Sequence, residues 1–139
     1  MIDPQRIISA ARETMGTPFH HQGRVVGVGM DCAGVLVHVL KSLGLPIIDE
    51  RGYPRFPYRG LIKSILDSQP SLLPIDKREM VTGDVLLMRI TREPQHVAIY
   101  TGATIVHAYS TAGGVVEHSL SPEWRGRIMG VYRIVEPAA

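Results

Sequence analysis

The 139-residue sequence predicts an α+β fold, in which N-terminal helices pack on a C-terminal antiparallel β-sheet of about five to six strands. Two observations lead to this prediction. Apolar residues recur at helical spacing in the first half of the chain, whereas short β-branched runs separated by turn residues follow Gly83 and Asp84. With 45% hydrophobic residues over this length, we expect one domain covering residues 1–139.

The first half of the chain contains three predicted helices. They cover residues 4–15, 32–43 and 60–67. Asp3 and Pro4 have the N-cap and first-turn chemistry that starts the first of them. The intervening segments are rich in glycine and proline and are predicted as loops, at residues 16–30 and 49–59.

The second half contains the predicted sheet. Its strands are expected at residues 85–90, 97–100, 105–109, 115–118 and 131–135. The connection 101–104 contains the glycine that a hairpin requires, so the strands on either side of it are expected to pair.

This hairpin brings two histidines together. If Thr101 pairs with Thr104, then Tyr100 faces Ile105, and residues 96 and 107 are diagonal neighbours on one face, with backbones about 7–8 Å apart. Imidazole side chains can close that distance. The spacing of eleven is therefore compatible with a hydrogen bond between His96 and His107.

Composition excludes several classes of function. The net charge is only +2 and the basic residues are scattered, so no nucleic-acid partner is expected. A single cysteine cannot form an internal disulfide. We find neither a signal peptide nor an apolar run long enough for membrane insertion, so we expect the protein to be soluble where it is made. The six histidines lack HExxH spacing, so no metal is expected.

The lone cysteine, Cys32, is either a buried small hydrophobe or a nucleophile. It is expected in the first turn of a helix, where the helix N-terminus and a neighbouring imidazolium would lower the pKa of its thiol. His96 and His107 are the candidates for a base and for the group that orients it.

An ordered set of short motifs strengthens the second interpretation. The set comprises GTPF at 16–19, DCAG at 31–34, GDV at 83–85, HVAIYTG at 96–102 and IVHA at 105–108. In this order the motifs resemble the NlpC-type cell-wall peptidases, which are papain-like cysteine enzymes. The resemblance covers about residues 4–135 and implies that Cys32 is the nucleophile, His96 the general base and His107 the residue that orients it.

The sequence departs from the family pattern beside the nucleophile. Phe19 stands where the family usually has a tyrosine that helps to stabilise the oxyanion, so His20 or His21 is a candidate replacement donor. Ala33 replaces a common serine. Asp31 is expected to cap the helix, with loop positioning as a second role.

The resemblance also implies a substrate and a setting. Family members typically hydrolyse peptidoglycan stem peptides, often between γ-D-glutamate and meso-diaminopimelate, and need no cofactor. The forms GTPFHHQG and GVGMDCAG look most like the branch found in phage tails and gene-transfer particles. We therefore expect synthesis in the bacterial cytoplasm, tail-tip or hub proteins as partners, and incorporation into a phage-like tail that carries the protein to the wall.

Other interpretations stay open. The chain could be a structural tail-tip subunit with weak or no activity, as Phe19 favours, or a thiol amidase or acyltransferase of the same fold. His38 and His118 are expected to be partly exposed structural residues. Four aromatic residues are expected to pack in the core or at an interface, with a role in lining a cleft as the alternative: Tyr53, Phe56, Tyr58 and Trp124.

Overall fold

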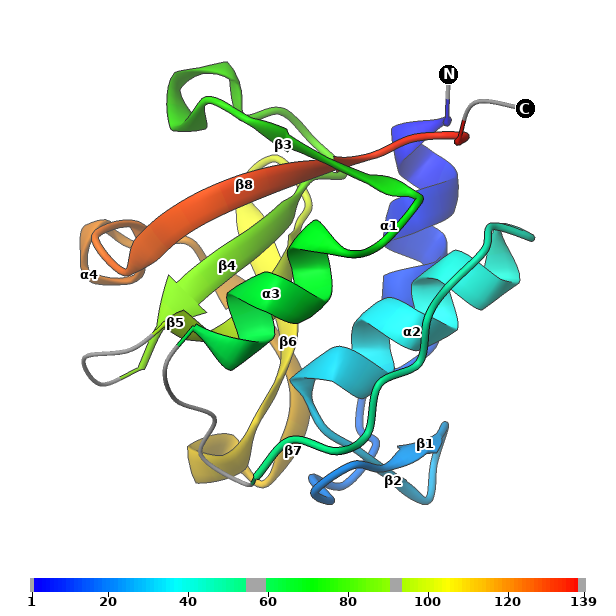
Figure 1. Cartoon of the computed structure of the whole chain (residues 1–139). Coiled ribbons are helices and arrows are strands. Elements are labelled where there is room, and N and C mark those ends of the chain that lie inside the picture. The colour runs from blue at the N-terminus through cyan, green and yellow to red at the C-terminus, as the bar shows by residue number, and fades with distance from the viewer. Residues whose placement is uncertain (1, 55–59, 91–93, 138–139) are drawn as a thin grey trace.

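A computed structural model describes residues 2–54, 60–90 and 94–137 and shows an α+β architecture (Figure 1). The helices of this described part are α1 (Pro4–Arg12), α2 (Cys32–Ser42), α3 (Leu61–Asp67) and α4 (Pro122–Arg125). The strands are β1 (Arg24–Val25), β2 (Gly29–Met30), β3 (Leu72–Ile75), β4 (Val85–Arg89), β5 (Pro94–Tyr100), β6 (Thr104–Tyr109), β7 (Gly114–Ser119) and β8 (Ile128–Ile134). Two 3₁₀ turns, Lys77–Glu79 and Ser110–Ala112, complete the regular structure.

Six of the strands form one antiparallel sheet in the order β3-β8-β4-β5-β6-β7, and β1 pairs with β2 in a separate two-stranded sheet. The predicted fold class is thus confirmed. Within the described residues, none of the helices combines the length and apolar character that crossing a bilayer requires.

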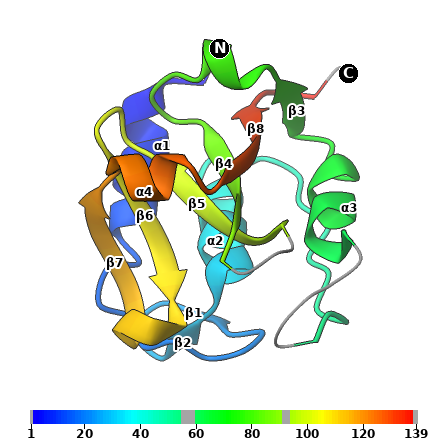
Figure 2. The same ribbon diagram turned by 90° about the vertical axis from the view of Figure 1, so that its left-hand side faces the viewer.

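The large sheet has a hydrophobic core on each face. Alternate residues of β5 and β6, such as Val97 and Val106, pack against α1, α2 and α3 on one face. Their neighbours Ala98 and Ile105 point to the other face, where Trp124 of α4 covers them. Figures 1 and 2 show α4 on the side of the sheet away from the longer helices.

Strands β5 and β6 diverge in the middle of the sheet. Among the residues described, their backbones pair at Ile99 with Val106 and at Tyr100 with Ile105, which confirms the predicted hairpin register at that point. By contrast, β6 and β7 pair at six positions. Figure 2 shows the two strands spreading apart beyond the hairpin, and His96 lies on this separated part of β5.

The N-terminal third of the chain differs from the prediction at two places. Helix α1 begins at Asp3 and Pro4 as predicted, but it ends at Arg12 rather than at residue 15. The hydroxyl of Thr14 donates to the Ala11 carbonyl at 2.6 Å and so competes with continuation of the helix. In addition, the segment 16–30 is not all loop, because β1 and β2 lie within it.

Besides β1, β2 and the two 3₁₀ turns, a further strand and a further helix have no counterpart in the sequence prediction. The prediction omits β3, which contains Pro74 and lies at the edge of the sheet, where a missing backbone donor is tolerated. It also omits α4, whose four residues are too few for a periodic signal and whose start is capped by Ser121. The predicted loop 49–59 is described only as far as residue 54.

Candidate active site

The loop before α2 and the helix N-cap fix the position of Cys32. Asp31 caps the helix as predicted, since its Oδ1 accepts a hydrogen bond from the Gly34 backbone at 2.9 Å. Its Oδ2 accepts another from the Gln22 backbone at 2.8 Å. The loop also packs directly on the helix, because a Cβ on Gly34 would lie 2.4 Å from the carbonyl oxygen of Gly23.

A buried polar network surrounds the Asp31 carboxylate. Arg24 lies 3.0 Å from Asp31 and 2.9 Å from Asp49, and it also donates to the Tyr53 hydroxyl at 2.8 Å. Tyr53 in turn donates to Asp31. The side chains of Arg24 and Asp31 are each only 7% exposed. The network therefore ties the segment containing Asp49 and Tyr53 to the start of α2 and to Cys32.

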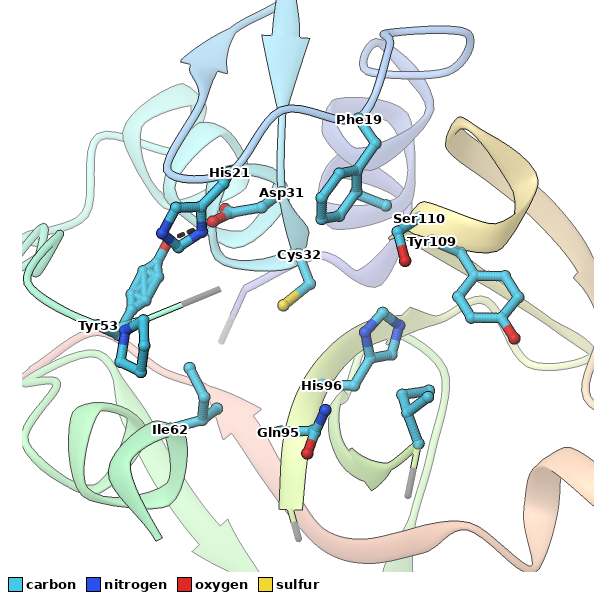
Figure 3. A pocket seen from close by; sticks show the side chains of 13 residues that line it. Phe19, His21, Asp31, Cys32, Tyr53, Ile62, Gln95, His96, Tyr109 and Ser110 are labelled. Carbon is cyan, nitrogen blue, oxygen red and sulfur yellow. Dashed lines mark hydrogen bonds between the residues drawn. The ribbon is translucent and has the colours of Figure 1, made fainter. Parts of the chain in front are cut away.

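Cys32 faces a pocket formed where the loop, α2, β5 and the end of β6 meet (Figure 3). In Figure 3 the sulfur of Cys32 and the ring of His96 point toward one another. One side of the pocket is formed by Phe19, Tyr109 and Ser110. The opposite side holds the second group of lining residues: His21, Asp31, Tyr53 and Ile62.

Burial determines the protonation of Cys32 and His96. It shifts the pKa of the Cys32 thiol upward, opposite to the direction that the sequence predicts. It raises the pKa of Cys32 to about 12, with a further increase from the Asp31 charge, while backbone hydrogen bonds of Val97 and Ala33 and the charge of Arg24 act in the opposite direction. Burial also lowers the pKa of His96 to about 4. Both shifts favour an uncharged pair at rest, because no imidazolium stands beside the sulfur to offset the cost of burying a thiolate.

A hydrogen bond joins His96 to His107, as the predicted register allows. His96 Nε2 and His107 Nδ1 lie 2.5 Å apart, and His107 is fully buried. A third histidine, His118, lies 2.8 Å from the other side of His107. The sequence predicts a partly exposed structural role for His118, and the residue is partly exposed, but its contact with His107 was not predicted. The separation of eleven residues between His96 and His107 recurs between His107 and His118, and this repeat is the sequence signal for the second contact.

The structure separates the two histidines proposed to replace the family tyrosine. His21 lines the pocket and packs edge-on against Tyr53, with ring centroids 5.6 Å apart. His20 is not among the lining residues described, and its Nδ1 contacts the His21 carbonyl oxygen at 3.0 Å. Phe19 is partly buried and lines the pocket.

Two pocket residues, Gln95 and Ser110, belong to none of the sequence motifs and were not predicted. Tyr53, for which lining a cleft was the alternative to packing, does both, because it lines the pocket and is buried in the polar network. Phe56 and Tyr58, two of the aromatic residues considered for a cleft, lie outside the described residues.

This arrangement of a thiol, a facing imidazole and a second hydrogen-bonded imidazole agrees with a family match. A model of the NlpC/P60 family matches residues 16–133. The chain belongs to the NlpC/P60 family. A search of curated proteins finds no match.

Solved NlpC/P60 structures share the fold. An NlpC/P60 protein from Bacillus cereus is 22% identical with a TM-score of 0.70, over 96% of this chain but only 41% of that one. RipB, a peptidoglycan hydrolase from Mycobacterium tuberculosis, is 23% identical with a TM-score of 0.69, over 96% of this chain and 65% of RipB. RipD from the same organism, described as non-catalytic and adapted to peptidoglycan binding, is 16% identical with a TM-score of 0.64, over 95% of this chain and 97% of RipD.

Proposed function

We propose that the protein is a cysteine endopeptidase that cleaves peptidoglycan stem peptides, with the bond between γ-D-glutamate and meso-diaminopimelate as its target. One observation carries the proposal. Cys32 at the start of α2 faces His96 across an accessible pocket, and His96 is hydrogen-bonded to the buried His107. An arrangement of thiol, imidazole and orienting group is the general form of thiol catalysis.

The reaction follows from the uncharged resting pair. His96 takes the thiol proton as the sulfur of Cys32 attacks the scissile carbonyl carbon, and the carbonyl oxygen becomes an oxyanion. When the tetrahedral intermediate collapses, the carbon–nitrogen bond breaks and His96 returns the proton to the leaving amine. Water, deprotonated by His96, then attacks the resulting thioester and releases the carboxylic acid and the thiol.

Stabilisation of the oxyanion is the weakest part of the site. The backbone N–H of Cys32 lies in the first turn of α2, where backbone donors lack intrahelical partners. Phe19 has no hydroxyl to add a second donor, and the loss of one oxyanion donor lowers rates by about 10²–10³ in other enzymes. Ser110 is on the same side of the pocket as Phe19 and carries a hydroxyl of the required type. We expect modest activity.

Digestion of purified peptidoglycan tests the proposal. The wild-type protein is expected to release stem-peptide fragments with new γ-D-glutamyl ends, identified by mass spectrometry. Cys32→Ala is expected to release none, whereas His38→Ala removes a partly exposed histidine paired with Glu13 and is expected to act like wild type. Equal release by wild type and Cys32→Ala would refute thiol catalysis.

A non-catalytic role in a phage-like tail is the second candidate. The absence of a hydroxyl at Phe19 supports it, as does the existence of RipD, a non-catalytic protein with this fold. The motifs around Phe19 and Cys32 support delivery by a tail particle in either case. Mass spectrometry of purified tail particles tests for incorporation beside tip or hub proteins, and absence of stem cleavage by reduced wild-type protein would favour the structural role.

A further inference from the structure

Three histidine rings form a hydrogen-bonded line that starts at the pocket. His96 Nε2 lies 2.5 Å from His107 Nδ1, and His107 Nε2 lies 2.8 Å from His118 Nε2. At the far end, His118 Nδ1 lies 3.0 Å from the backbone carbonyl oxygen of Ser119. The His96–His107 and His107–His118 contacts use all four of the ring nitrogens involved, which leaves His96 Nδ1 for Cys32.

The carbonyl at the end of the line determines where each proton lies. A carbonyl oxygen only accepts hydrogen bonds, so Nδ1 of His118 must carry its proton. A neutral imidazole has one N–H, so Nε2 of His118 accepts from Nε2 of His107. The same rule makes Nδ1 of His107 accept from Nε2 of His96. His96 Nδ1 is then unprotonated.

We propose that His118 is a positioning residue, which is anchored on the Ser119 carbonyl and, through His107, holds the basic lone pair of the pocket on His96 Nδ1. The inference rests on the proposed function only in naming His96 as the base. The inference concerns which ring nitrogen of His96 carries the proton, and this tautomer is a property of the free protein. Without such an anchor, the His96–His107 contact alone is satisfied equally well with the protons reversed.

Aromatic packing holds the line of rings in place. Trp124 of α4 packs against both distal rings, with centroids 5.2 Å from His107 and 5.0 Å from His118. Arg127 lies over the Trp124 ring at 4.6 Å, and its positive charge disfavours protonation of His96. Among the described residues, no three histidine, cysteine or acidic side chains are arranged to hold a metal ion.

Two substitutions separate hydrogen bonding from packing. His118→Leu keeps an apolar contact for Trp124 and removes the acceptor, whereas His118→Gln carries an amide oxygen that accepts from His107 and an amide N–H that donates. We expect His118→Leu to lower the rate of stem cleavage about tenfold, the effect of losing one partly buried hydrogen bond, and His118→Gln to stay within about threefold of wild type. His38→Leu is the matched control, and unfolding midpoints show whether each variant is folded.

Nitrogen-15 NMR of protein labelled at its histidine rings gives a readout that simple packing would not change. Wild-type His96, assigned by its loss in His96→Gln, is expected to show an unprotonated Nδ1, and the His118→Leu variant is expected to show a mixture of tautomers. A proton on Nδ1 in the wild type, an unchanged tautomer and rate in His118→Leu, or equal losses in the Leu and Gln variants would each overturn the inference. The NMR result holds even if peptidoglycan proves not to be the substrate.

Discussion

Replacing Arg24 with methionine is expected to destabilise the protein far more than replacing Arg51, which also pairs with Asp49. Arg24→Met keeps the length of the side chain but leaves the Asp31 carboxylate, which is 7% exposed, without its cationic partner. Hydrogen bonds to Asp31 from Gln22, Gly34 and Tyr53 remain, so the carboxylate stays in place but its charge is uncompensated.

The size of the effect follows from burial. Removing one partner of a buried ion pair typically costs about 3–5 kcal/mol in the free energy of unfolding. For a chain of this length, such a loss lowers the thermal midpoint by on the order of 10 °C. Denaturant unfolding of wild type and variant, followed by circular dichroism, measures the difference directly.

Arg51→Met provides the matched control. Arg51 also pairs with Asp49, at 3.1 Å, but its side chain is 56% exposed. An exposed ion pair contributes about 0–1 kcal/mol, so this variant is expected to unfold close to wild type. Similar losses in the two variants would refute the argument that burial of the Arg24–Asp31 pair, rather than the presence of an ion pair, makes this network important.

Three further predictions concern packing, catalysis and pH. Gly34→Ala is expected to destabilise the protein by about 1–3 kcal/mol, because the added Cβ would lie 2.4 Å from the Gly23 carbonyl oxygen. Gly126→Ala is the control and should have little effect, because the nearest atoms to its Cβ lie at 3.5 Å. Equal unfolding midpoints for the two variants would contradict this prediction. Phe19→Tyr is expected to raise the turnover of stem cleavage by up to about 10²-fold through a second oxyanion donor, and unchanged turnover would indicate that another group already fills this role. Because the pKa of His96 is lowered to about 4, the unfolded state binds a proton that the folded state does not as the pH falls from about 6.5. His96 therefore contributes stability that is present above pH 6.5 and falls by about 3 kcal/mol toward pH 4, and His96→Gln should reduce this slope in pH-dependent unfolding.

Local sequence rules predicted the features that depend on neighbouring residues. The helix start at Asp3 and the cap at Asp31 follow from N-cap chemistry, and the His96–His107 contact follows from hairpin register. The contact between Arg24 and Tyr53 could not be predicted from the sequence, because the two residues are distant along the chain and no periodic pattern links them. The expected direction of the Cys32 pKa shift was also wrong, because burial and the Asp31 charge raise this pKa, and burial is not visible in the sequence.

The divergence of β5 and β6 also bears on the dynamics of the site. The β6–β7 hairpin joins the rest of the sheet at two backbone pairs, together with the side-chain contact between His96 and His107. Separation of the strands at this junction would break the His96–His107 hydrogen bond and would also remove Val106 from the core beneath the helices, whereas Cys32 would stay on α2. The integrity of the site therefore depends on the packing of β6 against the helices as well as on the sheet, and a substrate bound across β5 and the end of β6 would hold the two strands together.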